Sequence, residues 1–417
     1  MPDSGSAPPV GVVGVRCANP YIDWMLSEGW NLTDPPSLIK GLAQTMVAQG
    51  VAVLRLRVTI RTLHPQAIGH SFTWHRDSGE VEVFRPPHSI LQTDQYLKSP
   101  YAAMFEGAGG IRRRLDVPGA ELEFPILQDL HAEGATDYVA MPLVFLDGKI
   151  NAITLATDRA GGFTTEELQQ VYDMLAVLAR LLEVHAMHYT ARTLLDTYLG
   201  KVTGQRVLDG LIKRGDGEDI NAVIWFCDLR GSTELAEDMA REDFLSLLNE
   251  FFDCMAGAVL DHGGEVLRFV GDAALAIFPI VAEDDEAGRE ACTRHDACRL
   301  ALMAAGDAME RIDALNQGRG ERDAPPVGFG IGLHIGDVLY GNIGVPERLE
   351  FTVVGAAANE AARLEGLCKT LKLPVLISGQ FAQFFPGELA SVGRHALRGV
   401  AEPQEIFTLP GLLADVS

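Results

Sequence analysis

The sequence is poor in basic residues relative to acidic ones, and this imbalance excludes several classes of partner. Among 417 residues, 34 are Lys or Arg and 57 are Asp or Glu, which gives a formal net charge of −23. Because so acidic a surface repels phosphate backbones and anionic lipids, we expect no binding to nucleic acid or to an anionic membrane. A protein of this charge that acts on a nucleotide must concentrate cationic side chains or metal ions at its site.

Paired cysteines, membrane spans and a leader peptide are also missing from the pattern. The six cysteines include no Cys-x-x-Cys pair, and their spacing is not that of a disulfide framework, so we expect reduced thiols. No apolar run is long enough to span a membrane, and the first residues lack the basic start and apolar core of a signal peptide. These features predict a cytoplasmic protein without a membrane span.

The amino-acid composition suits a globular protein with two hydrophobic cores. Hydrophobic residues make up 47% of the chain and charged residues 22%, which is ordinary composition for folded domains. Breaks in the pattern divide the chain into two domains joined by a helix. The predicted segments are a loose N-terminal stretch over 1–36, a first domain over 37–163, a connecting helix over 164–200, a linker over 201–217 and a second domain over 218–410.

The first domain is predicted from mixed helical and strand-like segments. We expect helices around 20–30 and 37–50, a strand over 51–61 and further strands within 70–85. Two apolar runs between 137 and 157 flank Asp147-Gly148, a pattern typical of a β-hairpin.

The connecting helix is predicted to begin at a capping box formed by Thr164 and Glu167. In its first turns the helix can pack on its own domain or pair with a second copy, and towards Tyr198 it is more typical of a dimer-forming stalk. Gly200 and Gly204 are expected to break it. Its apolar residues recur at a spacing close to a heptad, at Leu168, Val171, Leu175, Leu178, Leu182 and Tyr189.

The hairpin and the connecting helix together resemble the second half of a GAF-type sensory domain. The resemblance covers about forty residues and implies a small-molecule or protein input to the first domain.

The second domain has a clearer rhythm of strands and helices. A buried strand over 221–228 is followed by a long helix that ends near residue 261. Residues 210–220 form a polar linker before these elements. The later elements are strands over 265–270 and 273–279, a helix over 286–317, strands near 327–335, 337–343 and 350–354, a helix over 356–371 and a strand near 404–409. The order strand-helix-strand-strand-helix-strand predicts a ferredoxin-like α+β fold, which does not by itself identify a function.

A first candidate site is the segment 225–233 (WFCDLRGST), where an apolar strand ends and a Gly-containing turn opens a helix. The backbone N–H groups of Gly231, Ser232 and Thr233 are free at such a helix start and can bind phosphate. Asp228 at the strand end can hold a hard cation against the same phosphate. The alternative is that Asp228 only caps the helix.

A second candidate is Asp272, which follows Gly271 at the tip of a predicted hairpin. If the strands 221–228 and 265–270 are neighbours, Asp272 and Asp228 converge beside the phosphate-binding turn. Two converging carboxylates are the minimum for two-metal catalysis. The alternative is plain turn chemistry, because Gly-Asp favours tight turns.

A third candidate is the segment 351–365 (FTVVGAAANEAARLE), in which a short strand leads through a Gly into a helix. Asn359 and Arg363 are four residues apart and therefore share one helix face. Within a stretch of apolar and small residues, an adjacent amide and guanidinium favour an anionic, hydrogen-bonding partner. The alternative is a solvated face with a salt bridge from Arg363 to Glu360 or Glu365.

In this order and at these separations, the three segments resemble the catalytic domain of class III adenylate and guanylate cyclases over residues 218–410. The resemblance implies two Mg²⁺ or Mn²⁺ ions per site, bound by Asp228, Leu229 and Asp272. It also implies that Asn359 orients the ribose and that Arg363 stabilises the transition state.

The resemblance further implies a set of triphosphate contacts. Arg348 matches a family position that contacts the triphosphate, and Arg398 matches a basic position with the same role. Together with the turn at Gly231, Ser232 and Thr233, these arginines supply the local positive charge that the acidic chain otherwise lacks.

Two positions select the base in this family. Adenine-specific members carry Lys three residues before the Gly-Asp, and Asp or Thr three residues before the Gly of the third segment. This chain has Arg268 and Thr352, so it resembles the Lys/Thr-type adenylate cyclase branch with Arg in place of Lys. Arg268 can donate to adenine N1 while Thr352 accepts from the exocyclic amine, and we therefore predict ATP as the substrate.

Other readings of the second domain stay open. Arg268 is a donor-only group and could also donate to guanine O6 or to a pyrimidine carbonyl. The alternatives are therefore a cyclase for GTP or a pyrimidine nucleotide, or a catalytically silent nucleotide-binding dimerisation module.

The resemblance also implies a homodimer. In the family, the surface that carries Asp228 and Asp272 faces Asn359 and Arg363 of a second catalytic domain. Because this chain has one such domain, we expect a homodimer with two composite sites. The connecting helix would set the relative position of the two catalytic domains, which gives the first domain a means of regulation.

Overall fold

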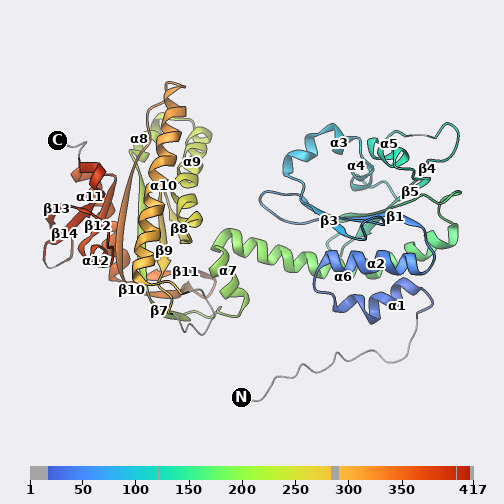
Figure 1. Cartoon of the computed structure of the whole chain (residues 1–417), viewed down its shortest axis with the longest axis horizontal. Coiled ribbons are helices and arrows are strands. Elements are labelled where there is room, and N and C mark those ends of the chain that lie inside the picture. The colour runs from blue at the N-terminus through green and yellow to red at the C-terminus, as the bar shows by residue number, and fades with distance from the viewer. Residues whose placement is uncertain (1–16, 121, 283–290, 401, 414–417) are drawn as a thin grey trace, which may run out of the picture. The chain divides into compact units, whose positions relative to one another are not determined.

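The computed structural model describes residues 17–120, 122–282, 291–400 and 402–413, which fall into two compact units (Figure 1). The first unit is Met1–Leu194 and the second is Leu195–Ser417. Of the loose stretch expected over 1–36, residues 1–16 lie outside the described residues, as does the expected helix start at 286. The described remainder is not loose, because α1 (Pro20–Ser27) buries Tyr21 and Met25 in the core of the first unit. Within the described ranges, none of the helices is long and apolar enough to cross a membrane.

A six-stranded antiparallel sheet forms the centre of the first unit, in the order β3-β2-β1-β6-β5-β4. Its strands are β1 (Val53–Arg61), β2 (Gly69–His75), β3 (Val81–Phe84), β4 (Ile111–Arg114), β5 (Asp137–Val144) and β6 (Ile150–Thr157). One face of the sheet is covered by apolar side chains of α1 (Pro20–Ser27), α2 (Pro35–Ala48) and α6 (Thr165–Leu199). The other face is covered by those of α4 (Pro100–Phe105) and α5 (Pro125–Ala132), near the short α3 (Asp94–Leu97). The predicted helices, strands and β5–β6 hairpin of this unit are confirmed.

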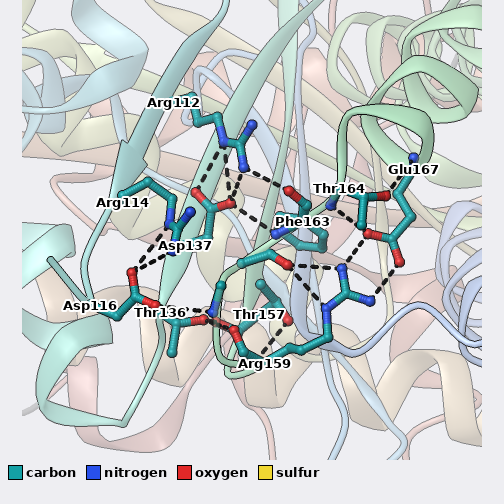
Figure 2. A network of polar contacts seen from close by, with 12 residues as sticks. Arg112, Arg114, Asp116, Thr136, Asp137, Thr157, Arg159, Phe163, Thr164 and Glu167 are labelled. Carbon is teal, nitrogen blue, oxygen red and sulfur yellow. Dashed lines mark hydrogen bonds and ion pairs between the residues drawn. The ribbon is translucent and has the colours of Figure 1, made fainter.

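A network of polar contacts fixes the start of α6 to this sheet (Figure 2). The capping box is confirmed, because the N–H of Glu167 donates to Oγ1 of Thr164 at 3.2 Å and the N–H of Thr164 donates to Oε2 of Glu167 at 2.7 Å. Beside it, the fully buried carboxylate of Asp137 accepts from Nη2 of Arg112 at 2.7 Å and from the N–H of Phe163 at 3.0 Å. The beginning of α6 is thus tied to β4 and β5.

The heptad-like series of α6 packs largely on its own domain. Val171, Leu175, Leu178 and Leu182 are buried in the core of the first unit, so the own-domain alternative holds for the first turns. The large exposed apolar side chains of α6 are different residues, namely Tyr172, Val184, Met187 and Tyr198.

The second unit contains a sheet whose main path is β13-β14-β12-β10-β7-β9-β8, with β11 paired to β10. α9 (Arg241–Asp261) and α10 (Arg294–Gly320) pack on one face, and α11 (Ala356–Leu371) packs on the other (Figure 1). The order β7-α9-β8-β9-α10-β10 matches the predicted ferredoxin-like α+β arrangement. The strands are β7 (Gly217–Arg230), β8 (Glu265–Val270), β9 (Ala273–Pro279), β10 (Gly328–Val345), β11 (Arg348–Val354), β12 (Val375–Ser378), β13 (Ala390–His395) and β14 (Gln404–Thr408). The unit also contains the short helices α7 (Lys201–Leu208), α8 (Ser232–Asp238) and α12 (Gly379–Ala382).

The predicted break at Gly204 is wrong. Gly200 does end α6, with a φ of 86°, but Gly204 lies inside α7, which occupies part of the expected linker. A side chain at Gly204 would begin 3.0 Å from the backbone carbon of Leu195, so glycine lets α7 fold back against the end of α6.

Two expected elements of the second unit also differ. The expected long helix ending near residue 261 is two helices, because Met239 and Ala240 are extended, and this break lets both helices pack on one core. The expected strands 327–335 and 337–343 are one strand, since Gly336 and Asp337 continue the pairing of β10 with β7. The short β12 and β13 were not predicted.

Candidate active site

The two candidate metal-binding aspartates lie together at one end of the sheet. The sequence predicts this convergence on the condition that β7 lies beside β8; instead β7 pairs with β9, and Asp228 lies opposite Ala273, the residue after Asp272. The N–H of Leu229 donates to the backbone oxygen of Asp272 at 3.3 Å. Burial, followed by the charge of Asp272, raises the pKa of Asp228 to about 6. The two carboxylates therefore converge and repel each other.

The turn after β7 opens α8 as expected. Gly231 is the N-cap residue with a φ of 70°, and no side chain caps the helix, so the alternative in which Asp228 is the cap is excluded. The first N–H groups of a helix have no intrahelical acceptor. Ser232 and Thr233, the first residues of α8, follow Asp228 by four and five positions, so their N–H groups lie near the end of β7 that carries Asp228.

An open groove runs along this turn. Asp228, Ser232 and Thr233 line it on one side, and Lys369 and Lys372 near the C-terminal end of α11 line it on the other. The two lysines were not singled out in the sequence, because they follow the third segment and their position beside β7 depends on the tertiary fold.

The helix with Asn359 and Arg363 packs closely on the sheet because β10 is rich in glycine. A side chain at Gly332 would begin 2.2 Å from the backbone oxygen of Ala361, so only glycine allows α11 this close. Asn359 is exposed and Arg363 is half-buried on the same face. Among the described residues, Arg363 forms no ion pair with Glu360 or Glu365, which removes the salt-bridge alternative.

The candidate arginines lie in two places, Arg363 and Arg398 at α11 and Arg348 at the tip of the β10–β11 hairpin. The guanidinium of Arg363 lies against Gly399, whose added Cβ would sit 3.3 Å from Nη2, and Arg398 is the neighbouring residue. Arg348 is exposed at the start of β11. None of these arginines has a hydrogen-bonded or ion-paired partner within the described ranges, so all three are available to an anionic ligand.

The candidate base-recognition residues lie on β8 and β11. Nη1 of Arg268 is 3.1 Å from a carboxylate oxygen of Glu350, a partner that the sequence analysis missed because it depends on the approach of β11 to β8. Thr352 is buried, and its Oγ1 has no hydrogen-bond partner in the structure. A buried hydroxyl without a partner is unfavourable and favours a ligand that hydrogen-bonds there.

The aspartates fit a divalent cation that is completed by other ligands. The described residues contain no group of three or more His, Cys, Asp or Glu side chains placed to hold a metal ion. Mg²⁺ commonly uses one or two carboxylates together with waters and substrate phosphates. The carboxylates of Asp228 and Asp272, with the backbone oxygen of Leu229, suit that pattern, and a cation would relieve their repulsion.

The structure brings the predicted residues together in two groups within one chain. Asp228, Asp272 and the turn at Gly231 form the first, and Asn359 and Arg363 form the second. In the described part of the chain, no hydrogen bond or ion pair joins the two groups.

Comparison with known proteins places the second unit in a family. Residues 218–408 match the adenylate and guanylate cyclase catalytic domain. An adenylate cyclase of Anabaena cylindrica is 33% identical over 171 residues, which cover 40% of this chain and 31% of that relative. Adenylate cyclase 1 of Rhizobium meliloti is 27% identical over 264 residues, which cover 61% of this chain and 38% of that relative. The chain thus spans about a third of the length of these curated relatives.

Among solved structures, the adenylyl cyclase CyaB of P. aeruginosa aligns with a TM-score of 0.41 and 23% identity, over 46% of this chain and 94% of that one. From the family match, residues 218–408 are a class III adenylate/guanylate cyclase catalytic domain. Both of these curated relatives are named adenylate cyclases.

Proposed function

We propose that the protein is a nucleotidyl cyclase that converts ATP to 3′,5′-cyclic AMP and pyrophosphate at a site shared by two copies of the chain. The observation that carries the proposal is the pairing of Asp228 with Asp272 beside the uncapped turn at Gly231. Converging carboxylates next to free helix N–H groups suit a metal–triphosphate complex. The cyclase family match over residues 218–408 supports the same reaction.

The chemistry divides among the two groups of residues. Bound Mg²⁺ or Mn²⁺ would activate the ribose 3′-hydroxyl and neutralise the departing pyrophosphate. Asp228, Leu229 and Asp272 hold the metal cation in place, and Asn359 orients the ribose. As the 3′-oxygen attacks the α-phosphorus, Arg363 offsets the negative charge that grows there, and loss of such a group costs about 3–4 kcal/mol of transition-state stabilisation.

The triphosphate is held by cationic side chains and backbone N–H groups. The N–H groups of Gly231, Ser232 and Thr233 bind one end, and Arg398, beside Arg363, and Arg348, at the start of β11, supply cationic contacts. These arginines have no partner among the described residues, which supports this role.

ATP is the substrate that the base-recognition residues favour. Thr352 accepts from the exocyclic amine of adenine, which satisfies its buried hydroxyl, and Arg268 donates to N1. GTP is the second candidate because of Glu350: its carboxylate lies beside Arg268 and could accept from N1–H and the amino group of guanine.

Two copies of the chain complete the site in this proposal. Asp228 and Asp272 of one chain work with Asn359 and Arg363 of the other, which agrees with the lack of polar contacts between the two groups in one chain. Val184 and Met187 on α6 are exposed apolar residues three positions apart, and Tyr198 lies eleven positions further on. This spacing suits a helix that pairs with its copy.

Regulation would come from the first domain. We propose that 37–163 is a GAF-like sensory domain, that 164–200 connects and pairs the chains, and that 218–410 is the catalytic domain beyond the 201–217 segment. Asp137 of β5 accepts from the N–H of Phe163, and Arg159, which follows β6, donates to Glu167 of α6 (Figure 2), so a change in that sheet would reach the connecting helix.

The proposal is tested by Asp272→Ala, assayed with ATP and Mn²⁺ and with the product identified by mass. Turnover should disappear while the secondary structure and the oligomeric state stay the same. Asp261→Ala, which removes an exposed aspartate on α9, is the matched control and should retain activity. Retained activity in Asp272→Ala would refute the two-carboxylate assignment.

A further inference from the structure

Three arginines on the central strand of the first unit form a cationic row. Arg55, Arg57 and Arg61 alternate along β1 and therefore point to the same side of the sheet. This is the side covered by α4 and α5, because Arg57 lies opposite Thr154 of β6. The ring of Tyr101 on α4 lies 5.7 Å from the guanidinium of Arg57, and the ring of Phe105 lies 5.1 Å from that of Arg61.

These arginines have no anionic partner. The Nε atoms of Arg55 and Arg57 are shielded from solvent and make no hydrogen bond. Within the described ranges, no carboxylate of the chain lies at ion-pair distance from any of the three. Six other arginines of the same unit do have such partners, namely Arg76, Arg112, Arg113, Arg114, Arg159 and Arg180.

A shortage of acidic residues does not explain why these arginines lack a partner. The chain has 57 acidic residues for 34 basic ones, so a carboxylate could readily stand opposite this row. Arg55 and Arg57 are partly buried and Arg61 is exposed, so the cost of leaving a guanidinium unpaired falls on the shielded Nε–H groups of the first two. The row therefore suits an anion that arrives from outside the chain.

Two cavities flank Arg57 and show the size of that anion. Arg55, Tyr138 and Thr154 line the first, which has a volume of about 20 Å³. Arg61, Thr59 and Phe105 line the second, which has a volume of about 70 Å³. Since one water needs roughly 10–15 Å³ by this measure, the cavities hold a few non-hydrogen atoms and are too small for a nucleotide.

The lining also indicates the chemistry of the ligand. The guanidinium fork of Arg57 matches the two oxygens of a carboxylate. The second cavity adds apolar surface from Phe84, Ile90 and Phe105, which suits a short hydrocarbon tail. We propose that the first unit binds a small monocarboxylate between the β1 arginine row and α4.

The proposal can be tested on the full chain by thermal shift without nucleotide. Sodium butyrate, at a concentration well above its dissociation constant, should raise the melting temperature of the first unit by about 2–4 °C. Equal concentrations of 1-butanol and sodium chloride should not, because the former lacks the charge and the latter lacks the planar pair of oxygens. Sodium phosphate is included as a separate arm.

Arg57→Met removes the charge while keeping an unbranched side chain. This variant should lose the butyrate shift and should be at least as stable as the wild type without ligand, because an unpaired cation has been removed. Arg76→Met, which removes an arginine that pairs with Asp158, is the matched control and should keep the shift. If Arg57→Met does not fold, Arg55→Met provides the same comparison.

Several results would overturn the proposal. These are no shift with butyrate in the wild type, an equal shift with 1-butanol, an equal shift in the variant that lacks the arginine, or a shift with phosphate alone. The readout needs no cyclase activity, so its failure is separate from that of the proposed function.

Discussion

Arg230 of β7 and Glu365 of α11 form a half-buried ion pair in which Nη2 of Arg230 lies 2.6 Å from Oε1 of Glu365. The same Nη2 donates to the backbone oxygen of Glu365 at 2.8 Å. Gly330 makes room for the pair, since its added Cβ would lie 2.1 Å from Nη2 of Arg230. Arg230 is two residues after Asp228, and Glu365 is two residues after Arg363. The pair thus joins the strand of the proposed metal site to the helix of the proposed transition-state arginine.

Breaking this pair should impair both stability and turnover. Glu365→Ala leaves Arg230 without its carboxylate and should lower the free energy of unfolding by about 3–5 kcal/mol. Arg230→Met combined with Glu365→Met should recover much of that stability but little of the turnover, because each chain gives its strand to one site and its helix to the other, and a shift between them misplaces both. Urea unfolding and cyclase assays measure the two effects, with Glu310→Ala on α10 as a control. Full activity in the stable double variant would show that the pair does not position the site.

The base pocket predicts a change in nucleotide preference. Thr352→Val keeps the shape but removes the hydroxyl, so kcat/KM for ATP should fall about 2- to 13-fold, the effect of about 0.5–1.5 kcal/mol for one hydrogen bond. Glu350→Gln should raise the ratio of ATP to GTP turnover, because guanine would lose a carboxylate acceptor. Steady-state kinetics with both nucleotides measure these effects, and Thr370→Val on the exposed side of α11 serves as the control. An unchanged kcat/KM for ATP in Thr352→Val would remove threonine from base recognition.

The shared site predicts complementation between two inactive variants. Asp228→Ala and Arg363→Ala should each be inactive alone. When the two chains are mixed equally and allowed to exchange, half of the dimers are mixed and each mixed dimer has one intact site, so about a quarter of wild-type activity should return. Native mass spectrometry confirms that mixed dimers have formed. Mixed dimers without activity would contradict a site built from two chains.

His334 on β10 predicts a specific dependence of stability on pH. Burial lowers its pKa from 6.5 to about 4, so it is neutral near pH 7 and forms no charged pair with Glu360, whose carboxylate lies 3.7 Å from Nε2. Between pH 6.5 and 4 the unfolded chain binds a proton that the folded chain does not. The free energy of unfolding should therefore fall with falling pH, by up to about 1.4 kcal/mol per pH unit from this residue.

His334→Gln removes that contribution. Between pH 7.5 and 5, the wild type should lose more stability than the variant in urea unfolding. The buried His70, whose pKa is also lowered to about 4 by burial, is present in both proteins and cancels in the comparison. Parallel pH profiles would show that His334 is not held neutral by burial.

The sequence predicted where the candidate site residues lie in the fold better than it predicted their surroundings. Asp228, Asp272, Asn359 and Arg363 follow from short motifs, because each motif fixes its own strand end, turn or helix face. The pairing of β7 with β9 was not predicted, since the choice between two adjacent strands of a hairpin depends on tertiary packing.

Contacts between distant segments could not be predicted either. Glu350 meets Arg268 only because β11 approaches β8, and the pairing of Arg230 with Glu365 depends on glycines of β10. The heptad-like spacing of α6 was ambiguous because a helix packed on a sheet and a helix packed on a second helix require a similar apolar stripe.

The most direct test of the central claim is the identity of the product. The full chain is incubated with ATP, GTP, CTP or UTP and Mn²⁺, and each mixture is analysed by mass spectrometry, with Asp272→Ala as the blank. The account predicts 3′,5′-cyclic AMP and pyrophosphate from ATP, and no cyclic product from the blank. A cyclic product made preferentially from another nucleotide would contradict the assignment of Arg268 and Thr352, and the absence of any cyclic product would contradict the proposed cyclase itself.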